Sequence, residues 1–296
     1  MTEPRKAPFV SALLLAALAL VAAGTGVFWQ GEPARFVFET LRGESVTIQG
    51  HGLYRFETVS IAAQAIAQDV VTLLVGIPLL LAGAVLSRKG SLRGRLLLTG
   101  TVGYFLYTYA SFVFGAAYNA LFLLYVALFS LGLITFIESL LAIDVATLPG
   151  RFSPRLPRRS IAAFLWAVAG FLLLAWLGRI VPALRAGTPP YGLESYTTLV
   201  IQGLDLGLIV PAAAIGGAQL LKRRPLGYLL ASIVLVKGLT LALAVSAMAV
   251  NMKLAGVAVK TEEMVMFPLL TVVGFVMTVV LLKNVSETSD PMSAPQ

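Results

Sequence analysis

Long apolar runs separated by short polar stretches make up most of the chain. Eight of these runs reach the length of about 20 residues that an α-helix needs to cross the hydrocarbon core of a bilayer. They lie at residues 8–28, 64–87, 96–116, 119–143, 160–182, 198–221, 226–249 and 264–282. The pattern predicts an all-α, polytopic integral membrane protein with eight transmembrane helices in contact with the lipid bilayer.

Composition agrees with a membrane protein and excludes several other classes. Of the 296 residues, 58% are hydrophobic and 12% are charged, whereas soluble domains carry about 25% charged residues. A soluble enzyme is therefore excluded. The chain has no cysteine and a single histidine, His51, which excludes disulfides, thiolate metal sites and histidine-rich metal sites. We expect neither a metal nor a cofactor.

The formal net charge of +8 comes mostly from loops on one side of the predicted membrane. The tightest basic clusters lie at 88–95, 151–159 and 222–224, all on the side of the two termini. Basic loops remain in the cytoplasm by the positive-inside rule. We therefore predict a cell-membrane protein with both termini in the cytoplasm.

Three segments lie outside the apolar pattern or at its ends. Residues 30–60 are polar, and their β-prone runs FVFETL and SVTIQ flank Arg42-Gly43-Glu44, which predicts a small extracytoplasmic hairpin lid. The mixed charge of this stretch argues against a nucleic-acid partner. Residues 1–28 form either the first helix or a cleaved signal peptide, and the length of the apolar run favours the helix. Residues 284–296 are rich in serine and proline, which predicts a disordered cytoplasmic tail.

The two halves of the chain resemble each other. Tyr54-Arg55-Phe56-Glu57-Thr58 matches Tyr191-Gly192-Leu193-Glu194-Ser195, Asp69 matches Asp205, and Pro78 matches Pro211. Because four helices separate equivalent positions, both halves have the same orientation. We predict two parallel four-helix repeats at 1–148 and 149–283, related by an axis along the membrane normal.

Charged side chains within the spans are the strongest candidates for a site, because each costs roughly 2.5–3.5 kcal/mol to insert. Lys237 lies near the predicted midplane, and Asp69 and Asp205 are within vertical reach of it. A Lys–Asp pair is the expected arrangement, either as a structural ion pair or as part of a binding site. Gln68 and Gln202 extend polar seams beside the two aspartates.

Aromatic side chains form a stripe along the third predicted helix. Tyr104 and Tyr107 belong to it. Such stripes usually pack in the core; the alternative is an aromatic-lined pocket for an apolar ligand, quinone or lipid. We include both tyrosines in the predicted substrate- or ion-binding set, together with Asp69, Asp205, Lys237, Gln68 and Gln202.

The stretch from GLYRFETV through AQDVVTLLVGIPLLL to ALFLLYVALFSL, roughly residues 50–140, resembles uncharacterised bacterial multi-pass membrane proteins. The resemblance implies a bacterial cytoplasmic membrane. It implies no activity and no functional residue.

Three functions agree with these observations. The first is transport or sensing of a small solute at a polar site between the second, sixth and seventh helices. The second is a scaffold that pairs with another membrane protein or with a second copy of the chain. The third is a membrane-embedded enzyme acting on a lipid or isoprenoid-like substrate, with Tyr104, Tyr107 and the carboxylates as acid/base groups; no catalytic motif supports it.

Overall fold

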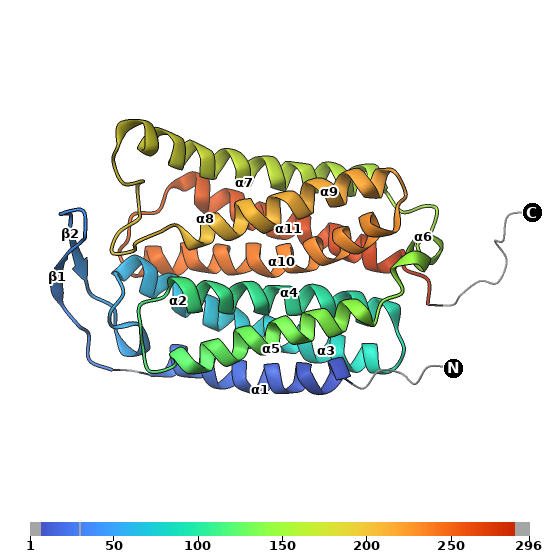
Figure 1. Cartoon of the computed structure of the whole chain (residues 1–296), viewed down its shortest axis with the longest axis horizontal. Helices are drawn as coiled ribbons and strands as arrows, with labels where there is room; N and C mark the ends of the chain where they lie inside the picture. Colours follow the sequence, from blue (N-terminus) through green and yellow to red (C-terminus); the bar gives the residue numbers. More distant parts are fainter. Residues whose placement is uncertain (1–6, 30, 288–296) are drawn as a thin grey trace, which may run out of the picture.

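The computed structural model describes residues 7–29 and 31–287. Its long helices lie side by side along one axis, as Figure 1 shows. Within the described residues, eight helices are long and apolar enough to cross a membrane: Pro8–Phe28, Val59–Arg88, Leu92–Gly115, Phe122–Leu141, Arg158–Ala186, Val200–Leu221, Pro225–Leu254 and Thr261–Lys283. The predicted all-α class is confirmed, as are eight helices suited to spanning a membrane.

Each predicted run corresponds to one of these spans, and two spans consist of several helical segments. The elements, in chain order, are α1 (Ala7–Phe28), β1 (Phe36–Glu39), β2 (Ser45–Ile48), η1 (Gly52–Tyr54), α2 (Val59–Val71), η2 (Thr72–Gly76), α3 (Ile77–Arg88), α4 (Leu92–Gly115), α5 (Phe122–Leu141), η3 (Val145–Thr147), α6 (Leu148–Arg151), α7 (Arg158–Ala186), α8 (Val200–Leu204), η4 (Asp205–Ile209), α9 (Val210–Leu221), α10 (Pro225–Leu254) and α11 (Thr261–Lys283).

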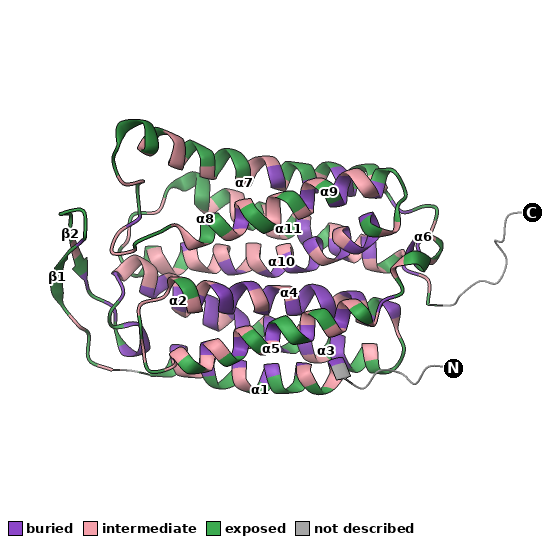
Figure 2. Ribbon diagram, viewed as in Figure 1, coloured by how far each residue is buried: buried purple, intermediate pink, exposed green. Residues whose placement is uncertain are grey.

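Helices α4 and α10 form the centre of the bundle. In the first half α1 packs on α2, α3 and α5, and α4 packs on α3 and α5. In the second half α9 packs on α7 and α10, and α10 packs on α11. Because α10 also packs on α2 and α4, it joins the halves. Figure 2 shows buried residues concentrated on α4, whereas α7 is mostly exposed.

The helices expose many large apolar side chains. Leu174 of α7 is 74% exposed and Val272 of α11 is 61% exposed. Many large apolar side chains exposed along the same helices form a surface that is stable where lipid replaces water. The long faces of the bundle therefore fit contact with the bilayer.

Two spans contain a wide turn immediately before a proline. The π-helical segment η2 precedes Pro78, and the π-helical segment η4 precedes Pro211. A proline ring clashes with the carbonyl four residues back, and widening the turn relieves that clash. The two segments lie 133 positions apart and place Thr72 and Asp205 at equivalent points.

Residues 30–60 contain the predicted hairpin. Strands β1 and β2 pair antiparallel, from Phe36 opposite Ile48 to Glu39 opposite Ser45. The turn contains Gly43 with φ of 78°, a conformation that glycine adopts without steric cost. The hairpin lies at the end of the bundle opposite the start of α1 (Figure 1). There Arg42 donates a hydrogen bond of 2.9 Å to the Tyr196 carbonyl.

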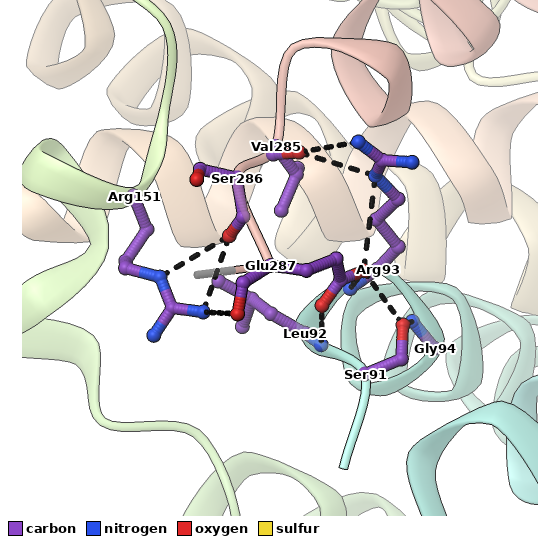
Figure 3. A network of polar contacts seen from close by, with 8 residues as sticks. All are labelled: Ser91, Leu92, Arg93, Gly94, Arg151, Val285, Ser286 and Glu287. Carbon is purple, nitrogen blue, oxygen red and sulfur yellow. Dashed lines mark hydrogen bonds and ion pairs between the residues drawn. The ribbon is translucent and has the colours of Figure 1, made fainter. Parts of the chain in front are cut away.

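The start of the predicted disordered tail, residues 284–287, packs against the bundle, as Figure 3 shows. Val285 pairs with Phe152 in an antiparallel bridge. Arg93 donates to the Val285 carbonyl at 2.6 Å, and Arg151 donates to the Glu287 carbonyl at 2.9 Å. The rest of the predicted tail, 288–296, lies outside the described residues.

Candidate functional site

A cavity of about 350 Å³ lies among α2, α4, α7, η4, α10 and α11. Its volume is in the range of small-molecule binding sites, roughly 300–1,000 Å³, and its wall is mainly apolar, as is typical of such sites. The polar and aromatic-polar side chains on the wall are Glu57, Gln64, Gln68, Tyr107, Thr108, Ser111, Trp176, Asp205 and Lys237.

Lys237 lies in the middle of α10 and is 4% exposed. Its Nζ atom has no hydrogen-bond partner among the described residues and lies 3.7 Å from the centroid of the Tyr107 ring. This geometry is a cation–π contact. The predicted Lys–Asp ion pair is not formed, because a sequence gives the height of a residue in the membrane but not the direction in which its side chain points.

Asp205 begins the wide turn η4 and accepts two hydrogen bonds from uncharged donors. The Tyr107 hydroxyl donates to Oδ1 at 2.7 Å, and Trp176 Nε1 donates to Oδ2 at 2.9 Å. Tyr107 therefore connects the two charges, with its ring at Lys237 and its hydroxyl at Asp205. The sequence analysis missed Trp176; the available signal was an indole N–H in an apolar span, which needs an acceptor when buried.

Asp69 has a different environment from Asp205. It accepts a hydrogen bond of 2.5 Å from the Tyr54 hydroxyl and faces Gly26 of α1. Burial, together with the charge of Asp69, raises the pKa of Tyr54 well above its ordinary value. Asp69 is not on the cavity wall. The structure therefore separates the two carboxylates that the sequence analysis placed in one site.

Gln68 connects α2 to α4. Its Nε2 atom donates to the Tyr104 hydroxyl at 2.7 Å and to Thr108 Oγ1 at 3.0 Å. Tyr104 is fully buried behind the cavity wall, and Gln202 is buried on α8 away from the wall. Of the predicted site residues, Gln68, Tyr107, Asp205 and Lys237 line the cavity, whereas Asp69, Tyr104 and Gln202 do not.

The cavity wall reaches Glu57, where the loops of the two halves meet. Glu57 accepts hydrogen bonds from the Tyr196 hydroxyl and from the Ala117 amide, the latter at 2.7 Å. The Thr58 hydroxyl donates to Glu194. Burial raises the pKa of Glu57 and the charge of Glu194 adds to this, although the hydrogen bonds from Tyr196 and Ala117 oppose it. The sequence analysis used both glutamates only as repeat markers and missed this junction.

Within the described residues, no group of three or more histidine, cysteine or acidic side chains is arranged to hold a metal ion. The fold and the cavity fit a multi-pass helical membrane protein with a cavity among its helices. The chain matches no protein-family model, no curated protein and no solved structure.

Proposed function

We propose that this membrane protein binds a small solute in the cavity and transports or senses it. The observation that carries the proposal is Lys237, a buried cation on the wall of a cavity of about 350 Å³ with no hydrogen-bond acceptor. A charge in a membrane span is costly unless a partner or a cavity accommodates it. A bound solute would supply the missing acceptor.

The alternatives receive less support from the same residues. A scaffold predicts a filled interior with Lys237 paired, and neither feature is present in the described residues. A lipid enzyme using both tyrosines needs Tyr104 on the wall, but Tyr104 is buried against Gln68 and Thr72.

Two parallel repeats would suit transport, since halves of this kind move relative to each other around a central site. Three observations support the repeat. The wide turns η2 and η4 lie 133 positions apart. The packing of α3 on α1 and α4 corresponds to that of α9 on α7 and α10. Where the loops of the two halves meet, the Thr58 hydroxyl donates a hydrogen bond to Glu194 and the Tyr196 hydroxyl donates one to Glu57. Each half therefore donates a hydrogen bond to the matching glutamate of the other half.

We also propose that the end carrying the start of α1 and the end of α11 is cytoplasmic. The basic clusters at 88–95, 151–159 and 222–224 lie in the loops and helix ends at this end, and the positive-inside rule supports the assignment.

Two glycine substitutions test the proposed binding site. Gly238 lines the cavity and Gly178 lies on the exposed face of α7, and a Cβ atom at either position meets nothing within 4 Å. We expect Gly238→Leu to fill the cavity and Gly178→Leu to leave it open. The measurement is the thermal unfolding midpoint of purified protein with sodium salts, amino acids, sugars and straight-chain lipids.

At least one of these solutes should stabilise the wild type and Gly178→Leu but not Gly238→Leu. The proposed site would be overturned if the solutes stabilised all three proteins equally. It would also be overturned if no solute stabilised the wild type. Flux of the stabilising solute into proteoliposomes then separates the two modes: uptake blocked by Gly238→Leu indicates transport, and binding without uptake indicates sensing.

A further inference from the structure

The cavity has two chemically different walls. Helices α7, α10 and α11 contribute apolar side chains that include Phe164, Phe171, Leu172, Val245 and Phe267. A small hydrophilic solute, such as a sugar or an amino acid, would leave this wall without an apolar partner. The ligand must therefore present an apolar portion of its own.

Helices α2 and α4 provide the polar wall. Gln64 and Gln68 lie four residues apart on α2, and Thr108 and Ser111 lie on the facing side of α4. Glu57 marks one end of this wall, just before α2 begins. A ligand with a polar head and an apolar tail matches the two walls.

Among the described residues of the cavity wall, Lys237 Nζ is a buried polar atom without a hydrogen-bond partner. The Lys237 ammonium carries three N–H donors, and none has an acceptor among the described residues. The carboxylate of Asp205, which accepts from Tyr107 and Trp176, makes no hydrogen bond with Lys237 Nζ. An acceptor on the ligand would give the Lys237 ammonium the hydrogen-bond partner that it lacks. In a cavity of low dielectric constant an anionic acceptor binds the ammonium more strongly than a neutral one.

We infer that the ligand is an anionic amphiphile, with one acidic head group bound by Lys237 and an apolar tail against α7, α10 and α11. This inference rests on the proposed function, because it assigns a ligand class to the same cavity. Trp176 lies on the wall, and replacing the exposed Trp29 and Trp166 by phenylalanine lets its fluorescence report occupancy.

The test compares ligands that differ only in the head group. Protein in phosphatidylcholine nanodiscs is titrated with dodecanoate, dodecyl phosphate, 1-dodecanol and dodecyltrimethylammonium, and the Kd is read from tryptophan fluorescence. We expect at least one of the two anions to bind the wild type about tenfold or more tightly than the alcohol, and the cation to bind most weakly. In Lys237→Met the preference for the anion should fall to about one, because the charge pairing is lost.

An alcohol that binds the wild type as tightly as the tighter-binding anion overturns the inference, and this comparison needs no variant to fold. A preference for the anion that persists in Lys237→Met also overturns it. If the alcohol and the anions bind equally and Gly238→Leu blocks them all, the proposed binding cavity stands and the head-group assignment fails. If no amphiphile binds and no solute stabilises the wild type, both proposals fail.

Discussion

The sequence comparison pairs Asp69 with Asp205, but the fold places them differently. The wide turns η2 and η4 align Asp205 with Thr72, and Asp69 lies about one turn earlier in its own span. Asp205 lies on the cavity wall between Tyr107 and Trp176, whereas Asp69 lies between Tyr54 and α1. Asp69 faces α1, which packs on α2, whereas Asp205 begins η4, which faces α7 and the cavity. At the residue scale, therefore, only one of the two carboxylates that the sequence comparison pairs lies on the cavity wall.

A glycine pair on α1 tests the environment of Asp69. A Cβ atom at Gly26 would overlap the Asp69 carboxylate and the Tyr54 hydroxyl, whereas a Cβ atom at Gly24 meets nothing within 4 Å. We expect Gly26→Ala to destabilise the protein by about 1–3 kcal/mol, the usual cost of overpacking. Gly24→Ala, the matched control, should be neutral or stabilising by up to about 1 kcal/mol. Unfolding midpoints in detergent measure both, and equal midpoints would contradict the contact.

At the scale of elements, the segment after α11 closes one end of the bundle. Glu287 accepts hydrogen bonds from the Ser91 hydroxyl at 2.7 Å and from the Leu92 amide at 2.8 Å, at the N-terminus of α4. Partial burial alone would raise the pKa of Glu287, but these hydrogen bonds and the charge of Arg93 lower it below its ordinary value of 4.5. A carboxylate at a helix N-terminus is stabilised by the free N–H groups there.

The lowered pKa sets the pH dependence of this contact. A carboxylate with a lowered folded-state pKa stabilises the fold above its unfolded pKa, and the contribution is lost as the pH falls through the folded pKa. We therefore expect Glu287→Gln at pH 7 to increase hydrogen exchange at Leu92 and Arg93. Glu44→Gln, at the opposite end of the molecule, is the control and should leave these amides unchanged. Unaltered exchange in Glu287→Gln would show that the cap contributes nothing.

At the scale of the whole molecule, Glu57 lies where the loops of the two halves meet. Its pKa is raised, chiefly by burial, so the folded protein binds the proton more tightly than the unfolded chain. Stability should then decrease as the pH rises from about 4.5 through the folded pKa of Glu57. In Glu57→Gln this decrease should be absent. The measurement is the unfolding midpoint from pH 4.5 to 8; identical profiles for the wild type and Glu57→Gln would refute the assignment.

The sequence by itself determined the eight long apolar helices, the hairpin and the presence of a lysine, Lys237, inside one of those helices. These follow from local quantities: the length of an apolar run, strand propensity around a glycine turn, and the cost of a charge in lipid. The tertiary structure decided that Asp205 rather than Asp69 lines the cavity. It also decided that Lys237 contacts Tyr107 and that Glu57 meets Tyr196. Each depends on how helices rotate and pack against one another, which the periodicity of a nearly uniformly apolar helix does not encode.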